Sequence, residues 1–226
     1  MTDDATPTVV AVDGPSGSGK STVSRGVAEA LGLSVLDTGA MYRAVTLAML
    51  ERGLDPADAE AAEAAARNAR IELEDGRVLL DGRDVTTQIR GPDVTRAVSI
   101  VSAHPGVRRV LVQRQRDWVA AHGGGVVEGR DIGTVVFPDA PVKVFLTASD
   151  NERARRRQRD EQAAHRDVDV QAVRDALDRR DRLDTTRAAS PLRKADDALL
   201  IDTTDRDADD VIAEIVGRFK ARRARS

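Results

Sequence analysis

Short apolar runs recur along the chain and alternate with longer segments of helical periodicity. The runs are bounded by turn-forming or charged residues, so each is predicted to be a short buried strand. They lie at residues 8–12, 34–36, 126–128, 142–146 and 198–201. Strands that alternate with helices are typical of a parallel sheet, and the pattern therefore predicts an α/β fold.

Between these runs, hydrophobic residues repeat at three- and four-residue spacing. Val23, Val27 and Leu31 form one such stripe, which ends at Gly32, a plausible helix C-cap. The predicted helices of the core cover residues 20–31, 40–52, 106–122, 151–166, 170–182 and 211–219. The helices at 151–166 and 170–182 are strongly charged, whereas the others have an apolar face to place against the sheet.

The pattern changes between residues 54 and 104. An alanine-rich helix at 60–69 is followed by three short strands with the close turns Asp75-Gly76 and Asp81-Gly82 between them. Such turns connect antiparallel strands, unlike those of the core. We therefore predict a core of residues 1–53 and 105–226 that carries a small α+β insertion at residues 54–104.

Composition narrows the classes of protein that fit this pattern. The formal net charge is −3 at pH 7, whereas a general nucleic-acid binder would usually be basic. The chain has no cysteine, which excludes disulfides and thiolate metal sites. It has no apolar run of membrane-spanning length, and its acidic first residues do not resemble a secretory signal. We expect a cytoplasmic protein without nucleic-acid or membrane partners.

A phosphate-binding motif follows the first apolar run directly. Residues Gly14-Pro15-Ser16-Gly17-Ser18-Gly19-Lys20-Ser21 fit G-x-x-x-x-G-K-[ST], the P-loop. Its glycines allow a tight turn in which successive N–H groups point into one concavity. Lys20 can reach the outer phosphates of a nucleotide, and the Ser21 hydroxyl can ligate Mg²⁺. The helix that follows adds the favourable end of its dipole.

Charged residues gather in segments that follow predicted strands or flank them, where ligands of open α/β sheets bind. These segments are 37–43, 128–131, Ser99 with Arg108, the arginine series at 153–159, and 180–187. Any one of these residues could instead cap a helix or form a surface ion pair, and the helix at 151–166 could be a solvated face. Their co-occurrence with a P-loop favours movement of a phosphoryl group between two polyanions.

The P-loop and three of these segments, in this order along the chain, resemble the bacterial cytidylate kinase family. They read GPSGSGKS, DTGAMYR, EGRDIGTVVFPDAP and RDRLDTTRAASPL, and the resemblance extends over essentially the whole chain. It implies transfer of a phosphoryl group from ATP to CMP or dCMP, with Mg²⁺, by a monomer. It also implies that the insertion at 54–104 binds the monophosphate and that residues from about 149 to 168 form a helical lid.

The resemblance further implies roles for individual residues. The ATP site comprises Gly14, Pro15, Ser16, Gly17, Ser18, Gly19, Lys20, Ser21 and Thr22. The CMP site comprises Thr38, Arg43, Ser99, Arg108, Arg130, Asp131, Arg180, Asp184 and Arg187. The residues implied to be catalytic are Lys20, Arg130, Arg187, Arg157 and Arg153. Those implied to ligate Mg²⁺ are Ser21 and Asp37. We expect the lid arginines Arg153 and Arg157 to be exposed without ligand, and the role of Glu128 stays open.

The main alternative is a nucleotide-sensing P-loop module without kinase activity. A pure binder needs fewer groups placed for transfer, so Lys20, Ser21 and the arginines favour the kinase. A regulatory GTPase would carry N-K-x-D and an ABC-type ATPase would carry LSGGQ, and the sequence has neither. The three histidines have no metal-ligand spacing, and we expect His104, His122 and His165 to be structural or exposed.

Overall fold

A computed structural model describes residues 8–74, 76–163 and 168–224. The chain divides into two compact units. The P-loop unit comprises Met1–Val35, Val119–Thr186 and Ser190–Ser226, and the insertion-bearing unit comprises Leu36–Trp118 and Arg187–Ala189. His165 and part of the predicted lid, residues 164–167, lie outside the described residues.

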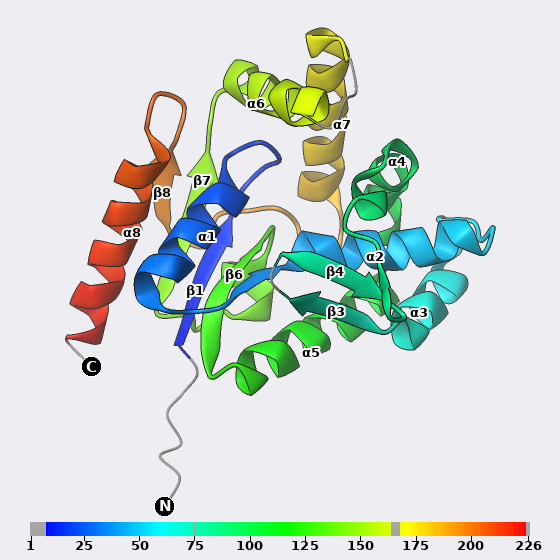
Figure 1. The fold of residues 1–226 in the computed structure, drawn as a ribbon, viewed down its shortest axis with the longest axis horizontal. Helices are drawn as coiled ribbons and strands as arrows, with labels where there is room; N and C mark the ends of the chain where they lie inside the picture. The colour runs from blue at the N-terminus through cyan, green and yellow to red at the C-terminus, as the bar shows by residue number, and fades with distance from the viewer. Residues whose placement is uncertain (1–7, 75, 164–167, 225–226) are drawn as a thin grey trace, which may run out of the picture. The chain divides into compact units, whose positions relative to one another are not determined.

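The P-loop unit is built on a five-stranded sheet with the strand order β2-β6-β1-β7-β8 (Figure 1). β1 pairs in parallel with β6 on one side and with β7 on the other, and β7 pairs in parallel with β8. The strands are β1 (Thr8–Asp13), β2 (Val35–Asp37), β6 (Gly124–Gly129), β7 (Val142–Thr147) and β8 (Leu199–Asp202). The predicted α/β fold with a parallel sheet is confirmed.

The central position of β1 explains its composition. Val10, Ala11 and Val12 are fully buried, because helices or loops cover both faces of a parallel sheet and neighbouring strands cover both edges. β6 begins two residues earlier than predicted, at Gly124, which has a φ of 141°. A Cβ at this glycine would lie 2.5 Å from the Thr8 carbonyl oxygen, so glycine at this position lets β6 approach β1 closely.

Two helices from opposite ends of the described chain pack together on this sheet. α1 (Lys20–Leu31) contributes Val23, Val27 and Ala28 to the core of the P-loop unit. α8 (Ala208–Arg223) contributes Val211, Ile215 and Phe219 to the same core. The two helices lie beside each other in Figure 1. The predicted amphipathic stripes of both helices are thus the faces that they bury.

The predicted lid segment forms a pair of packed helices, α6 (Asp150–Ala163) and α7 (Val170–Thr186). They share a small apolar cluster of Ala154, Val173 and Leu177. α7 continues four residues beyond the predicted end at residue 182. Polar contacts also connect the pair: Arg153 of α6 is ion-paired with Asp181 of α7, and Arg174 of α7 donates to Asn151 Oδ1 of α6 at 3.1 Å. The stability of the pair therefore depends less on hydrophobic burial than that of the sheet.

The insertion-bearing unit has a separate core. Its helices are α2 (Thr38–Glu51), α3 (Ala59–Asn68), α4 (Pro92–Val101) and α5 (Pro105–Ala121), together with the short turn η1 (Gln88–Arg90). Its antiparallel sheet has the order β3-β4-β5, formed by Ile71–Glu74, Arg77–Leu80 and Arg83–Asp84. This unit contains the whole of residues 54–104, whose boundaries as a domain stay a prediction.

Three elements have no counterpart in the sequence prediction, and the first is the turn η1. The second, α4, begins at Gly91-Pro92, where proline occupies the first helical turn, and buries Val94, Val98 and Val101. The third is η2 (Ile132–Val136), a single turn of π-helix after β6. Among the described residues, no helix is both long and apolar enough to span a membrane.

Candidate active site

The P-loop joins the end of β1 to the start of α1, as predicted. Gly14, Gly17 and Gly19 have φ values of 149°, 79° and 85°. A Cβ on Gly14 would lie 2.1 Å from the Leu146 carbonyl oxygen, and one on Gly17 would lie 2.9 Å from that of Arg153. Glycine is therefore required at both positions by close backbone approach as well as by conformation.

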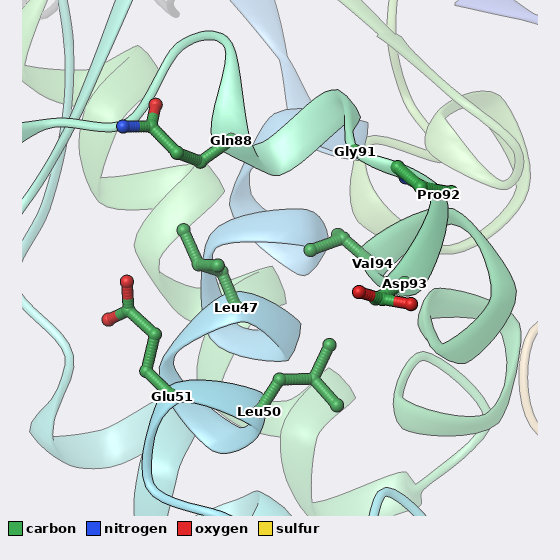
Figure 2. Close-up of a pocket in the computed structure, with 8 residues that line it drawn as sticks. All are labelled: Leu47, Leu50, Glu51, Gln88, Gly91, Pro92, Asp93 and Val94. Carbon is green, nitrogen blue, oxygen red and sulfur yellow. The ribbon is translucent and has the colours of Figure 1, made fainter.

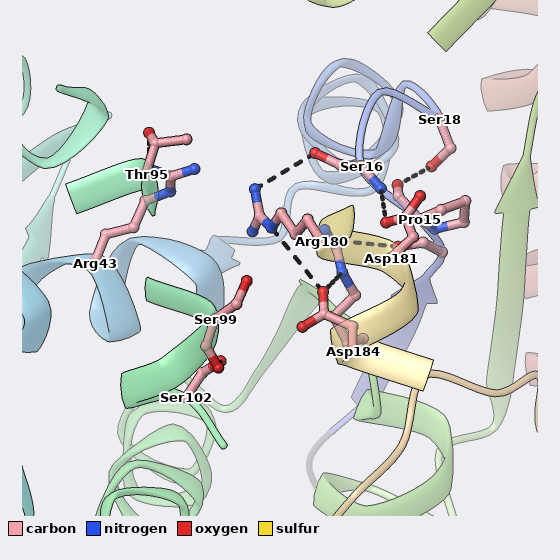
Figure 3. Close-up of polar contacts among 12 residues, drawn as sticks. Pro15, Ser16, Ser18, Arg43, Thr95, Ser99, Ser102, Arg180, Asp181 and Asp184 are labelled. Carbon is pink, nitrogen blue, oxygen red and sulfur yellow. Dashed lines mark hydrogen bonds and ion pairs between the residues drawn. The ribbon is translucent and has the colours of Figure 1, made fainter. Parts of the chain in front are cut away.

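Lys20 is folded back onto the loop. Its Nζ donates a hydrogen bond to the Pro15 carbonyl oxygen at 2.7 Å. Desolvation, and then the positive charge of Arg130, lower the pKa of Lys20 to about 7. The same Pro15 oxygen accepts a hydrogen bond from Ser18 Oγ at 3.0 Å (Figure 3). An incoming polyanion would supply the negative charge that this ammonium group lacks.

The P-loop hydroxyl has a carboxylate partner that the sequence left without a role. Ser21 Oγ donates to Glu128 Oε1 at 2.8 Å. Glu128 is buried at the end of β6, the strand next to β1. Parallel strands place their carboxyl ends at one edge of a sheet, and this topology is the signal that links the two residues.

Arg130 connects three segments of the P-loop unit. Its Nε donates to Asp184 Oδ2 of α7 at 3.0 Å, and its Nη1 donates to the Gly14 carbonyl oxygen at 2.8 Å. Arg180 lies on the same side, with Nη1 3.5 Å from Ser16 Oγ and Nε 4.0 Å from Asp184 Oδ2 (Figure 3). Burial, followed by Arg130, lowers the pKa of Arg180 to about 10. The sequence-predicted residues Lys20, Arg130, Arg180 and Asp184 are therefore close together.

The expectation that Arg153 is exposed without ligand is wrong. Only 6% of this residue is exposed. Its guanidinium contacts the Asp181 carboxylate, donates to the Ser16 carbonyl oxygen at 3.1 Å and pairs with Asp150 at 2.7 Å. Asp181 in turn accepts a hydrogen bond from the Ser16 backbone N–H at 3.2 Å. These contacts reach the P-loop, so the side chain is buried against it and is not solvated along a helix face.

Arg157, the second lid arginine, is ion-paired with Glu161 one turn further along α6. Its side chain is 23% exposed, against 7% for that of Arg153. The two predicted lid arginines thus differ before any ligand binds, and Arg157 is the more accessible.

A buried carboxylate that sequence reasoning missed lies directly before the P-loop. Asp13, the last residue of β1, is 5% exposed. Its Oδ1 accepts the Ile132 N–H and its Oδ2 accepts the Gly133 N–H, each at 2.8 Å. Burial, and to a lesser degree the nearby Asp131, raise the pKa of Asp13 to about 6 in spite of these two bonds.

The remaining predicted residues belong to the insertion-bearing unit. Asp37 caps α2, where its Oδ1 accepts the Ala40 N–H at 3.1 Å, and Oδ2 is 3.7 Å from Arg90. This is the capping role that the sequence left open for strand-end acids. Thr38 follows it as the first residue of α2 and is buried.

Arg43 and Arg108 are both buried in this unit. Arg43 Nη1 donates to the Ile89 carbonyl oxygen at 3.1 Å and to Thr95 Oγ1 at 2.9 Å (Figure 3). Arg108 lies over the Tyr42 ring, 5.3 Å from its centroid, and Nη1 donates to the Ser102 carbonyl oxygen at 3.3 Å.

Ser99 is a buried residue of α4, one turn before Ser102. Arg187 belongs to the short segment 187–189 of the same unit. The insertion-bearing unit thus carries Asp37, Thr38, Arg43, Ser99, Arg108 and Arg187, and the P-loop unit carries the other predicted site residues.

A shallow groove on the insertion-bearing unit does not coincide with these residues (Figure 2). It is lined by Leu47 and Leu50 of α2 and by Pro92 and Val94 at the start of α4. None of the predicted nucleotide-binding residues lines it. The groove therefore adds nothing to the functional assignment.

The described side chains contain no metal-binding cluster of three or more His, Cys, Asp or Glu residues. This arrangement is compatible with Mg²⁺, because that ion keeps several waters and is held by one or two protein groups together with substrate phosphates. Ser21 and Glu128 supply two hard oxygen ligands 2.8 Å apart beside the P-loop.

A P-loop between a central parallel strand and a helix, with a lysine and several arginines around it, defines a nucleotide-dependent phosphotransferase of the P-loop kinase class. Comparison with known protein families identifies the family within this class. The family model described as cytidylate kinase matches residues 10–221. The chain belongs to the cytidylate kinase family.

Individual relatives agree with this family. A cytidylate kinase of Mycolicibacterium paratuberculosis is 57% identical over 201 residues, which cover 87% of this chain and 88% of the relative. One of Corynebacterium glutamicum is 52% identical over 222 residues, which cover 96% of each. The crystal structure of an uncharacterized protein from Eubacterium ventriosum aligns over 95% of this chain and 99% of its own, with a TM-score of 0.52 and 12% identity, and supports the fold alone.

Proposed function

We propose that this protein transfers the γ-phosphoryl group of ATP to CMP or dCMP and so forms CDP or dCDP. The observation that carries the proposal is Arg130, which lies between the P-loop and α7 in a member of the cytidylate kinase family. The donor nucleotide would occupy the P-loop, and the acceptor phosphate would meet the arginines. Both ends of a phosphoryl transfer are then within reach of one guanidinium.

ATP would be held by residues 14–22. The backbone N–H groups of the loop would bind the phosphates together with Lys20. Ser21 and Glu128, whose oxygens are hydrogen-bonded to each other, would hold Mg²⁺. Bound Mg²⁺ would neutralise charge on the phosphates as it is redistributed during transfer. Asp37 remains a second candidate from the sequence for ordering the metal shell.

CMP would be bound by three groups of residues. Arg43, Arg130 and Arg187 would hold its phosphate, because guanidinium groups bind phosphate oxygens in a bidentate manner. Ser99, Arg108 and Asp131 would form hydrogen bonds with the edge of the cytosine base. Thr38, five residues before Arg43 in the sequence, would also contact CMP. Arg180 and Asp184 would bind the ribose hydroxyls, which would replace part of the present pairing of Asp184 with Arg130.

The chemistry requires no general base. The acceptor is a phosphate monoester that is already anionic near neutral pH, so catalysis consists of positioning and charge stabilisation. Lys20 in its protonated form, Arg130 and the lid arginines Arg153 and Arg157 would neutralise the transferring group. Closure of α6 and α7 would exclude water and suppress ATP hydrolysis.

The proposal is tested by a coupled assay with ATP and Mg²⁺ and each of CMP, dCMP, UMP, AMP and GMP. We expect CMP and dCMP to be the fastest acceptors. Lys20→Met keeps most of the side-chain volume but removes the charge, and we expect kcat to fall on the order of a thousandfold, the scale found when a major electrostatic stabiliser is lost. The matched control is Lys220→Met, on the exposed side of α8.

Faster turnover of AMP or GMP than of CMP would overturn the acceptor assignment. Binding of ATP without transfer to any of the five acceptors would instead favour the nucleotide-sensing module. We further propose that the enzyme acts as a monomer, as the family resemblance implies, and that it acts in the cytoplasm. Sedimentation of the purified protein measures the first of these properties.

A further inference from the structure

The end of β1 and the turn after β6 are tied together in both directions. From the first segment, the Asp13 carboxylate accepts the backbone N–H groups of Ile132 and Gly133, each at 2.8 Å. From the second, the Arg130 guanidinium donates to the Gly14 carbonyl oxygen at 2.8 Å. Asp13 of the first segment thus binds residues of the second, and Arg130 of the second binds Gly14, the residue after Asp13.

The turn that Asp13 holds carries two of the proposed acceptor-binding residues. Arg130 and Asp131 directly precede Ile132, the first residue of η2. The π-turn itself closes through hydrogen bonds to the Asp131 and Ile132 carbonyl oxygens, from Val136 N at 3.2 Å and Phe137 N at 2.7 Å. The N–H groups that begin such a turn have no partner within it. Asp13 supplies that partner for both Ile132 and Gly133.

β1 itself gains little from this carboxylate. Asp13 is paired in register with Gly129 on one side and with Phe145 on the other, so the sheet already fixes its backbone. An apolar residue would avoid the desolvation of a charge in this position. What the carboxylate adds is control over the residues after β6.

We propose that Asp13 is a positioning residue that fixes Arg130 and Asp131 relative to the P-loop, so that the acceptor nucleotide is presented to the donor. This inference rests on the proposed function, because it needs those two residues to contact the acceptor. Asp13 itself would touch neither nucleotide.

The ionisation of Asp13 makes the proposal testable by pH. The pKa of Asp13 is raised to about 6 by burial first, with the Gly133 and Ile132 N–H groups and Lys20 opposing the rise and Asp131 adding to it. Lys143 of β7 also approaches Gly133 and pairs with Asp197. Above pH 6 both carboxylate oxygens accept hydrogen bonds. Below pH 6, one oxygen is protonated and becomes a donor that faces an N–H donor. The turn then loses one of its two hydrogen bonds to Asp13.

Asp13→Asn reproduces the protonated state, since the amide also has one acceptor and one donor end. At pH 7.5 we expect kcat/KM for CMP to fall about tenfold to a hundredfold, the range for loss of a hydrogen bond to a charged group. The KM for ATP should stay within about twofold, because the sheet and the glycines hold the P-loop. The control is Asp58→Asn, whose carboxylate caps α3 by accepting the Glu60 and Ala61 N–H groups at 3.0 Å each.

The ratio of kcat/KM for CMP between wild type and Asp13→Asn should decline toward one as the pH falls from 7.5 to 5. Ionisation of the CMP phosphate affects both enzymes equally and cancels in this ratio. Equal losses toward ATP and CMP, or a ratio that does not change with pH, would overturn the positioning role. If the variant does not fold, the titration of the Ile132 and Gly133 amides in the wild-type protein tests the same interaction.

A measurement without nucleotide separates this inference from the proposed function. The backbone amide resonances of Ile132 and Gly133 should titrate with an apparent pKa near that of Asp13 in wild type, and their hydrogen exchange should be faster in Asp13→Asn. If both hold but CMP is not phosphorylated, the proposed function fails and the acceptor part of the inference fails with it. If CMP is phosphorylated and the amides do not titrate, only the inference fails.

Discussion

At the scale of single residues, the site holds its charges in a nucleotide-free arrangement that costs free energy. Lys20 donates its hydrogen bond to the Pro15 carbonyl oxygen, whereas in a working kinase it would donate to a phosphate oxygen. The pKa of Lys20 is lowered to about 7. Arg180 is affected in the same direction, to about 10. For both groups, desolvation and the neighbouring Arg130 outweigh the nearby carboxylates, and a bound polyanion would add the negative charge that offsets them. The binding energy of a nucleotide thus depends on the charge state of these residues.

Binding of ATP should therefore be accompanied by proton uptake at Lys20. With a pKa of about 7, the amine is about half protonated at pH 7, whereas in contact with phosphate it is fully protonated. We expect an uptake of about half a proton at pH 7, more at pH 8 and almost none at pH 5.5. Calorimetric titration in buffers of different ionisation enthalpy measures this number.

The comparison that isolates the lysine is Lys20→Met, because proton release from ATP itself is common to both proteins. The difference between the two uptake curves should rise between pH 6 and 8. A difference of zero throughout that range would mean that Lys20 is already fully charged before the nucleotide binds.

At the scale of elements, motifs with fixed spacing were predictable and single polar contacts were not. The P-loop and the strands beside it follow from a local pattern, and the structure has them where the sequence predicts them. Asp13 and Glu128 are single acids at strand ends, and their roles depend on a parallel pairing of β1 with β6 that sequence spacing does not encode. The burial of Arg153 depends on Asp181, which comes from another helix.

The missed elements have local causes. α4 starts at a glycine and a proline, which usually mark turns in a sequence, whereas here the proline occupies the first helical turn. η2 has no periodicity of its own, and the N–H groups at its start are bound by the Asp13 carboxylate, which lies far away in the sequence.

The lid pair α6–α7 should open locally before the sheet does. Its apolar cluster contains three buried residues, and Leu177 is the largest of them. Leu177→Ala should cost about 2 kcal/mol, the lower end for a buried leucine, because the cluster is small. We expect faster amide hydrogen exchange throughout α6 and α7 and little change in β1, β6 and β7.

Leu183→Ala on the same helix is the control, since Leu183 is 47% exposed. It should leave the exchange rates of α6 and α7 unchanged. If Leu177→Ala accelerated exchange in the sheet to the same extent, the lid pair would unfold together with the core and could not move independently of it.

At the scale of the whole molecule, two separate cores support the two units. One contains β1, α1 and α8, and the other contains α2, β4 and the start of α4. A ligand that binds only the folded P-loop unit stabilises that unit by RT ln(1 + [L]/Kd), which is about 2.7 kcal/mol at a hundredfold excess over Kd.

A non-hydrolysable ATP analogue with Mg²⁺ should consequently raise the melting temperature by about 5–10 °C under these conditions, given about 2–4 °C per kcal/mol for a chain of this size. Differential scanning calorimetry measures the shift. Lys20→Met should show a much smaller shift at the same analogue concentration. An equal shift in both proteins would place the stabilising contacts away from the P-loop lysine.

The packing of α1 against α8 has a consequence for biosynthesis. Val23 and Val27 leave the ribosome long before Ile215 and Phe219, which belong to the same core. Likewise, neither edge of β1 can be paired until β6 and β7, which come later in the sequence, have been synthesised. Contacts so distant in sequence form slowly and late. The nascent polypeptide therefore carries its phosphate-binding motif without a finished scaffold beneath it until α8 has been synthesised, and we expect its affinity for nucleotide to develop only then.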